Sequence, residues 1–236
     1  MRLDKLLSTL GAATRSESKA LLKAGRVQVN GETVRDGGKP VGEGDEVILD
    51  GQRLDTRTER HLLLCKPAGV LTAAEDRRQP TVMDLLPPVY RSLNCMPVGR
   101  LDKDSEGLIL MTSDGDIVNR ILRADGRHEK EYEVAVDKPI TGEFLRRMRE
   151  GVPVLGRKTL PAHVTRTGTG SFRIILVQGL NRQIRRMCEY LGYRVVHLKR
   201  VRIMNITLGD MEPGHWRPLS EDELDTLMET LSAPNK

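Results

Sequence analysis

The chain contains only three cysteines among its 236 residues, Cys65, Cys95 and Cys188. They are odd in number and far apart, so their spacing matches neither a zinc site nor a disulfide framework. This pattern excludes a disulfide-stabilised secreted scaffold and a cysteine-ligated metal centre. Unpaired cysteines suit a reducing cytosol, and we therefore expect a cytoplasmic protein.

Long apolar runs and aromatic residues are also scarce. Residues 1–5 (MRLDK) lack the apolar stretch of a signal peptide, and no apolar run approaches the length that spans a bilayer. We therefore expect no membrane association. The chain has only two Phe, four Tyr and one Trp, so an aromatic residue beside a charged motif, as Tyr132 is, becomes a candidate for ligand contact.

Basic residues exceed acidic ones only modestly, with 38 Lys and Arg against 33 Asp and Glu and a net charge of +5. Their distribution is more informative, because basic residues gather within residues 182–202. They are Arg182, Arg185, Arg186, Arg194, Lys199, Arg200 and Arg202. Clustered guanidinium groups pair well with phosphates, which points to nucleic acid. A solvated helix face is the alternative explanation.

Residues 1–55 have the pattern of a small, separate module. Leucines recur at helical spacing within residues 3–10, and a second helix is predicted from about residue 15 to residue 23. Thr14 is a suitable N-cap for that helix, with Glu17 as its capping-box partner. The alternating residues that follow predict short strands joined by tight turns.

The remainder of the chain predicts one larger domain. Residues 56–60 are polar and aperiodic, so we expect a linker there. Residues 61–236 contain more predicted strands than helices, without regular alternation of the two. This pattern predicts an α+β domain with a largely antiparallel mixed sheet. An amphipathic helix is predicted over residues 181–190.

A Gly-bounded loop with three acids, a lysine and an arginine lies within residues 99–110 (GRLDKDSEGLIL) and runs directly into an apolar strand. Asp102, Asp104 and Glu106 match the opening of a calcium loop. An EF-hand also needs a bidentate carboxylate at its twelfth position, where Ser113 stands, and helices on both sides. We therefore favour a catalytic aspartate beside an arginine, with a solvated acidic turn as the remaining alternative.

Residues 1–55 resemble the S-four RNA-binding domain, also called the αL motif. The similarity rests on residues 2–7 (RLDKLL), Arg15, residues 25–31 (GRVQVNG) and residues 44–47 (GDEV). The resemblance implies that the two helices present basic side chains to RNA phosphates. These side chains are Arg2, Lys5, Arg15, Lys19 and Arg26.

The chain as a whole resembles bacterial pseudouridine synthases of the RsuA type. Four motifs occur in that family's order, at residues 66–69 (KPAG), 99–108 (GRLDKDSEGL), 128–132 (HEKEY) and 179–187 (GLNRQIRRM). The resemblance implies an S-four-like domain followed by a pseudouridine synthase catalytic domain. It also implies an isomerase that modifies uridine in RNA.

The resemblance assigns roles to individual residues. Asp102 is implied to be the catalytic carboxylate, Tyr132 to stack on the target base, and Arg185 to pair with Asp102. Further substrate contacts are expected from Arg100 and Leu176. From its strand pattern alone, Tyr132 could instead be a core residue. Whether Asp102 forms a covalent adduct or abstracts a ribose proton stays open.

The residues themselves leave the cationic partner of Asp102 open. Positions 182, 185 and 186 of one helix cannot all face one site, so Arg182 or Arg186 could be the partner. Both are otherwise expected to bind RNA. A cation keeps a buried carboxylate ionised, and stacking on an aromatic ring offsets about 1–3 kcal/mol of the cost of unstacking a base. No hydride, phosphate or electron moves, so no cofactor and no metal are expected.

Substrate choice follows from the similarity within the family, which is strongest to large-subunit enzymes. This favours a uridine of 23S ribosomal RNA, modified by a monomer. Alternatives are a small-subunit site, a neighbouring large-subunit uridine, or tRNA as a second substrate. A non-catalytic RNA-binding assembly factor is the rival from another class. A methyltransferase would need a Gly-rich cofactor loop after an early strand, which this sequence lacks.

Overall fold

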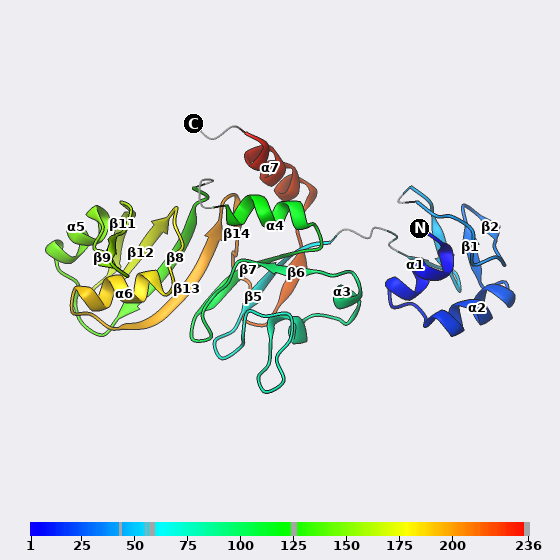
Figure 1. Cartoon of the computed structure of the whole chain (residues 1–236), viewed down its shortest axis with the longest axis horizontal. Helices are drawn as coiled ribbons and strands as arrows, with labels where there is room; N and C mark the ends of the chain where they lie inside the picture. Colours follow the sequence, from blue (N-terminus) through cyan, green and yellow to red (C-terminus); the bar gives the residue numbers. More distant parts are fainter. Residues whose placement is uncertain (43, 55, 57–59, 124–126, 234–236) are drawn as a thin grey trace. The chain divides into compact units, whose positions relative to one another are not determined.

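The computed structural model describes residues 1–42, 44–54, 56, 60–123 and 127–233. The chain forms two compact units (Figure 1). Residues 1–60 form the first unit together with the short segments 86–96 and 112–114, and the rest of the chain forms the second. Most of the predicted linker, residues 56–60, lies outside the described residues.

The amino-terminal part of the first unit combines two helices with a four-stranded antiparallel sheet of order β2-β1-β3-β4. Helix α1 spans Leu3–Thr9 and α2 spans Arg15–Lys23. The predicted capping box of α2 is present, because Thr14 Oγ1 accepts from the Glu17 amide at 3.2 Å and the Glu17 carboxylate accepts from the Thr14 amide at 2.8 Å. The strands are β1 (Val27–Val29), β2 (Glu32–Thr33), β3 (Val47–Leu49) and β4 (Gln52–Leu54).

Apolar residues at helical spacing form the core of this module. Leu3, Leu6 and Leu7 of α1 are at most 2% exposed, and they pack against Leu22 of α2 and Val27 of β1. Each such burial contributes about 1.5–3 kcal/mol. The helices are therefore fixed on the sheet by one apolar face, which leaves the opposite, basic face in solvent.

A nine-stranded mixed sheet is the base of the second unit. Its path is β11-β12-β8-β13-β7-β5-β15, with β14 paired to β13 and β6 to β7. Strands β11, β12, β8 and β13 pair antiparallel, whereas β13 runs parallel to β7. The strands are β5 (His61–Lys66), β6 (Met96–Val98), β7 (Glu106–Thr112), β8 (Lys130–Val136), β11 (His163–Gly168), β12 (Ser171–Leu176), β13 (Val195–Ile203), β14 (Ile206–Thr207) and β15 (Trp216–Pro218). The predicted α+β class with a largely antiparallel sheet is confirmed.

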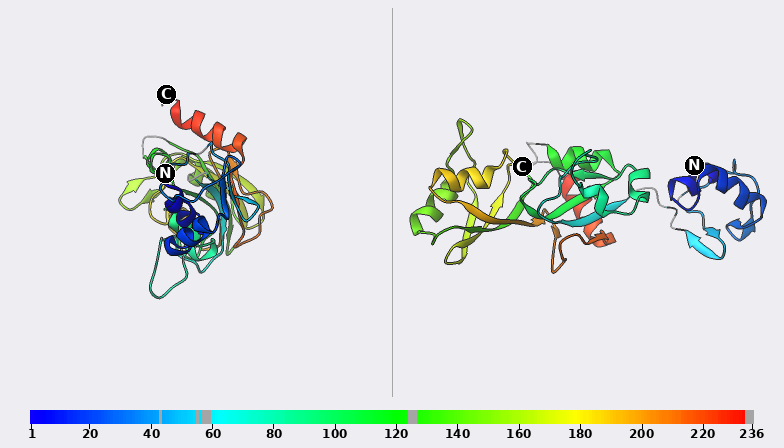
Figure 2. Two further views of the ribbon diagram at one scale, coloured as in Figure 1. Left: turned by 90° about the vertical axis from the view of Figure 1, so that its right-hand side faces the viewer. Right: turned by 90° about the horizontal axis from the view of Figure 1, so that it is seen from below.

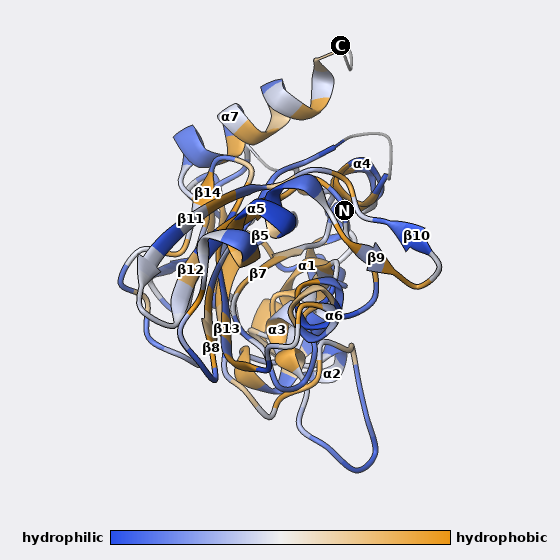
Figure 3. Ribbon diagram, turned by 90° about the vertical axis from the view of Figure 1, so that its left-hand side faces the viewer, coloured by the Kyte–Doolittle hydropathy of each residue, from blue (hydrophilic) through white to orange (hydrophobic). Residues whose placement is uncertain are grey.

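Helices cover this sheet, and a separate hairpin joins β9 (Pro153–Val154) to β10 (Arg157–Lys158). The helices of the second unit are η1 (Val82–Leu85), α4 (Gly115–Leu122), α5 (Gly142–Glu150), α6 (Gln183–Tyr190) and α7 (Glu221–Ser232), whereas α3 (Val89–Ser92) belongs to segment 86–96 of the first unit. Helix α7, in red, packs against α4, in green (Figures 1 and 2). Strands β5 and β7 are hydrophobic and buried, whereas α5 and α6 carry polar residues outward (Figure 3). No described helix is long and apolar enough to cross a membrane.

The parallel contact between β7 and β13 positions the loop that carries Asp102. Arg200 of β13 pairs with Gly107 of β7 on one side and with Tyr132 of β8 on the other. Its side chain is 3% exposed, and its Nε donates to the Leu108 carbonyl at 2.8 Å. Gly107, Arg200 and Tyr132 thus lie side by side on three neighbouring strands. Because neighbouring strands are about 5 Å apart, Tyr132 lies about 10 Å from Gly107.

Candidate active site

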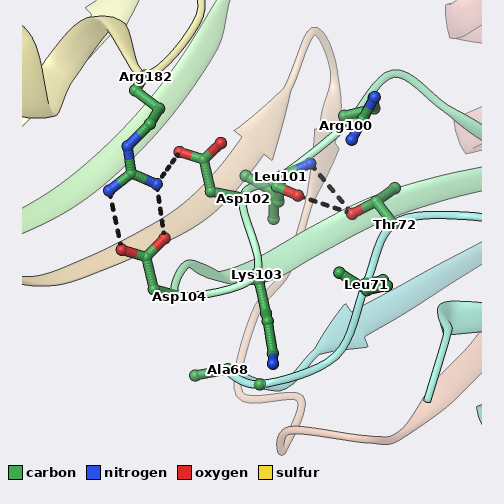
Figure 4. Close-up of a pocket in the computed structure, with 10 residues that line it drawn as sticks. Ala68, Leu71, Thr72, Arg100, Leu101, Asp102, Lys103, Asp104 and Arg182 are labelled. Carbon is green, nitrogen blue, oxygen red and sulfur yellow. Dashed lines mark hydrogen bonds and ion pairs between the residues drawn. The ribbon is translucent and has the colours of Figure 1, made fainter. Parts of the chain in front are cut away.

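The acidic loop between β6 and β7 meets the beginning of helix α6. Arg182 lies just before α6 with a left-handed φ of 50°, and its guanidinium faces two carboxylates (Figure 4). Its Nη1 and Nη2 donate to Asp104 at 3.1 and 3.0 Å, and Nη1 lies 3.4 Å from Oδ2 of Asp102. The hydrogen bonds from Arg182 hold the pKa of Asp104 below its ordinary value.

This geometry corrects the predicted pairing of Arg185 with Asp102. The Arg185 Nη2 instead donates to the Asp104 carbonyl at 3.0 Å and to the Ser105 hydroxyl at 3.2 Å. The physical reason is position along α6. Arg182 precedes the first turn and reaches both carboxylates. Arg185 lies one turn later, is only 15% exposed, and reaches Asp104, with Nη2 3.4 Å from its Oδ2, but not Asp102.

A buried lysine supports the same loop. Lys66, the last residue of β5, is 0% exposed, and its Nζ donates to the carbonyls of Ser105 at 2.7 Å, Pro67 at 3.0 Å and Lys103 at 3.3 Å. The Gly69 amide adds a hydrogen bond to the Lys103 carbonyl at 2.7 Å. Burial lowers the pKa of Lys66 to about 8. The loop therefore depends on a lysine whose pKa lies well below the ordinary value for lysine.

We expect the rate of the reaction at this site to fall as the pH rises through about 8, where the pKa of Lys66 lies. Neutral Lys66 has two N–H donors for three carbonyls, so it holds the loop less firmly. Single-turnover rates between pH 6.5 and 9.5 measure this effect. In Lys66→Met the rate is expected to be lower at neutral pH and to lack the fall near pH 8.

The free energy of unfolding is expected to change with pH in the opposite direction to the rate, which provides a second check on the pKa of Lys66. Because the pKa of Lys66 is lowered from 10.5 to about 8, the unfolded chain binds more protons in that window. This lysine therefore makes the free energy of unfolding rise with pH between those values. The same pH profile for the rate in Lys66→Met and in the wild type would contradict the role of Lys66.

The loop opens onto a pocket of about 620 Å³. Small-molecule sites usually have volumes of about 300–1,000 Å³, so a nucleotide base and its ribose fit in this space. The side chain of Asp102 is 30% exposed and is therefore accessible to a ligand there. The residues that line the pocket are Ala68, Gly69, Leu71, Thr72, Arg100, Leu101, Asp102, Lys103, Asp104 and Arg182 (Figure 4).

Comparison with known proteins places this site in a family. A profile described as RNA pseudouridylate synthase matches residues 60–190, and an S4 domain profile matches residues 1–47. The chain belongs to the RNA pseudouridylate synthase family. The family resemblance and the two kinds of domain predicted from the sequence are thereby confirmed.

Individual relatives agree with this assignment. The dual-specificity RNA pseudouridine synthase RluF of Escherichia coli (strain K12) is 46% identical over 236 residues, which cover 98% of this chain and 79% of that protein. The ribosomal large subunit pseudouridine synthase B of Bacillus subtilis (strain 168) is 31% identical and is covered to 95%. A crystal structure of a pseudouridylate synthase matches 96% of this chain and 99% of that chain, with a TM-score of 0.68 and 28% identity.

Of the other predicted substrate residues of this pseudouridylate synthase, one lines the pocket and two do not. Arg100 lines it and is exposed. Tyr132 is half-buried on β8 and packs against a core cluster that includes Leu176, which is 4% exposed on β12. Neither residue is among the described residues that line the pocket. Arg186 donates its Nε to the Asn181 carbonyl at 3.1 Å.

The basic residues predicted to bind RNA on the first unit are all exposed. Arg2 pairs with Asp4 at 2.8 Å, and Arg26 makes a bidentate pair with Asp50. Within the described part of the chain, the side chains of Lys5, Arg15 and Lys19 form no hydrogen bond or ion pair. The latter three are therefore available to phosphates without first breaking an ion pair.

The acids of the loop face basic groups rather than one another. Asp102 and Asp104 face Arg182, and Glu106 contacts the His197 ring. Among the described residues, no three His, Cys, Asp or Glu side chains gather in a way that could hold a metal ion. The loop that matches the opening of a calcium site therefore presents its carboxylates to arginine and histidine side chains.

Sequence reasoning missed three contributors to this site. Asp104 is more than a turn residue, since it is the bidentate partner of Arg182. Lys66, which the sequence does not distinguish from an ordinary turn residue, holds the loop from within the core. Thr72 was not singled out, although its hydroxyl bonds the residue before Asp102. The only available signal was that a Lys-Pro pair ends an apolar strand.

Proposed function

We propose that the chain isomerises uridine to pseudouridine in RNA, with 23S ribosomal RNA as its preferred substrate. The observation that carries this proposal is the position of Asp102, accessible at the pocket with Oδ2 3.4 Å from Arg182. The relatives named as RNA and large-subunit pseudouridine synthases support the reaction and the substrate. Because ribosomal RNA lies in the cytoplasm, we propose that the protein acts there. We also propose that it acts as a monomer.

The reaction exchanges one bond of the nucleotide for another. The bond between ribose C1′ and N1 of uracil breaks, the base turns in the pocket, and a bond forms between C1′ and C5. The hydrogen on C5 leaves as a proton, and N1 gains one, so substrate and product are isomers. Asp102 acts on the ribose, and the Arg182 guanidinium lies 3.4 Å from its Oδ2.

The target nucleotide must leave its stack to reach Asp102. Tyr132 stacks on the extruded base, Leu176 packs beneath it, and Arg100 contacts the nucleotide at the mouth of the pocket. Arg182, Arg185 and Arg186 on and beside α6 provide positive charge next to the pocket for the flanking phosphates. Lys5, Arg15 and Lys19 of the S4 domain bind phosphates farther along the RNA, together with Arg2 and Arg26.

A second RNA substrate is favoured by the name of one relative. The RluF protein, 46% identical to this chain, is named as a dual-specificity enzyme. A tRNA is the second substrate that we propose. Its anticodon and other loops offer unpaired uridines, which cost less to flip than paired ones.

Mapping of pseudouridines tests the substrate. Total RNA is compared between a strain with the gene, a strain without it, and the deletion strain carrying the gene on a plasmid. We expect at least one 23S position to lose and then regain its pseudouridine, and a tRNA position to follow the same pattern. Loss at a 16S position alone would overturn the preferred substrate, and no change at any position would overturn the proposed activity.

A further inference from the structure

The residue before Asp102 is held by one buried side chain. The Thr72 hydroxyl donates to the Leu101 carbonyl at 2.9 Å and accepts from the Leu101 amide at 3.2 Å. Figure 4 shows both bonds. Thr72 is 7% exposed and Leu101 is also 7% exposed, so water does not readily replace the hydroxyl. A hydroxyl has one donor and two acceptor sites, and this pair of bonds uses the donor and one acceptor site.

These bonds control the peptide group that leads into Asp102. The Leu101 carbonyl and the Asp102 amide belong to one planar unit, so fixing the carbonyl fixes the orientation of that plane. On the other side of Asp102, Lys66 and Gly69 hold the Lys103 carbonyl. The backbone of Asp102 is thereby held on both sides by one segment of the chain, residues 66–72.

The structure assigns Thr72 the role of a positioning residue that orients the Asp102 carboxylate toward the ribose. This inference rests on the proposed function. Thr72 contributes through its hydroxyl and needs no contact with the substrate. A displacement of about 1 Å at a reacting group can cost about 100-fold in rate, so loss of one such constraint affects the chemical step more than RNA binding.

Two substitutions at Thr72 separate its hydroxyl from its shape. Thr72→Val keeps the shape and removes the hydrogen bonds, whereas Thr72→Ser keeps the hydroxyl. Thr159→Val is a matched control, because Thr159 is 3% exposed and its hydroxyl accepts from the Val152 amide at 3.0 Å, a bond that does not involve the loop. The assay measures single-turnover release of tritium from C5 of uridine in a 23S transcript, and filter binding measures the Kd for the same RNA.

We expect Thr72→Val to lower the single-turnover rate about 10- to 100-fold while the Kd changes less than about 3-fold. Thr72→Ser is expected to stay within about 3-fold of the wild type, and so is Thr159→Val when measured below its Tm. If Thr72→Val does not fold, Thr72→Ala is compared with Thr72→Ser in the same way.

The outcomes distinguish this inference from the proposed function. A wild-type enzyme that releases no tritium from the transcript or from tRNA, in parallel with an inactive Asp102→Asn control, would mean that the proposed function fails. An active wild type with an equally active Thr72→Val, or a Thr72→Ser as slow as Thr72→Val, would overturn the positioning role alone. A slow Thr72→Val with restored activity in Thr72→Ser supports it.

Discussion

Replacing Asp102 with asparagine is expected to abolish pseudouridine formation, with a loss of at least about 10⁴-fold in single-turnover rate. Asparagine keeps the size of the side chain but has neither the negative charge nor the carboxylate oxygen that would act as nucleophile or as base in the proposed reaction. Stability is expected to change by less than about 1 kcal/mol, because Asp102 is 30% exposed and lies 3.4 Å from Arg182. Tritium release and the Kd for the same RNA measure the two effects.

Asp104→Asn provides the comparison within the same loop. It weakens the bidentate bond to Arg182 and leaves the Asp102 carboxylate unchanged. We expect a loss of about 10-fold in rate, far smaller than that of Asp102→Asn. If Asp102→Asn retained activity, a non-catalytic role such as an RNA-binding assembly factor would become the better explanation. Equal losses in the two variants would mean that the loop acts as a charged unit.

Helices α1 and α2 of the first unit could be predicted closely from local sequence rules. Both follow from apolar residues at helical spacing, and the capping box of Thr14 and Glu17 marks the beginning of α2 correctly. These signals connect residues three or four positions apart, and such interactions are encoded locally. The α+β class of the second unit follows from the larger number of predicted strands than helices and the lack of regular alternation between the two.

The ion pairs of the site could not be predicted in this way. Arg182 and Asp104 are 78 residues apart, and their bond depends on how α6 meets the loop between β6 and β7. Helical periodicity limited which of the arginines could share one site but did not select Arg182 over Arg185. The left-handed backbone of Arg182, which places it ahead of the helix, is not visible in residue spacing.

The supporting side chains were hidden for another reason. Lys66 and Thr72 are polar residues that sequence patterns assign to turns and surfaces, yet both are buried. Their burial is tolerable because each finds backbone partners in the loop, at Ser105 for Lys66 and at Leu101 for Thr72. Such partners exist only once the segment of residues 66–72 and the loop are packed together, so the signal is tertiary.

Replacing Gly107 with alanine is expected to destabilise the second unit by about 3–5 kcal/mol. Gly107 has a φ of 103°, and an added Cβ would lie 2.2 Å from the Arg200 carbonyl oxygen and 2.7 Å from its amide nitrogen. Both atoms belong to the backbone of β13, so no side-chain rotation can relieve the overlap. Urea unfolding followed by the fluorescence of Trp216, the single tryptophan, reports on this unit.

Gly115→Ala is the matched control for this substitution. Gly115 begins α4, has no positive φ, and an added Cβ there meets nothing within 4 Å. We expect its stability to match that of the wild type or to rise by up to about 1 kcal/mol, since alanine is the better helix former. A loss in Gly115→Ala as large as that in Gly107→Ala would show that the close approach of β7 to β13 is not the cause.

Gly107→Ala is also expected to slow the reaction in molecules that remain folded. Strand β13 must move away from β7 to admit the new Cβ, and Gly107 lies five positions after Asp102. Because Arg200 also pairs with Tyr132, the movement changes the spacing between the carboxylate and the ring proposed to stack on the base. We expect the single-turnover rate per folded molecule to fall about 10-fold or more. A normal rate would mean that the spacing of the two strands is set elsewhere than at this glycine.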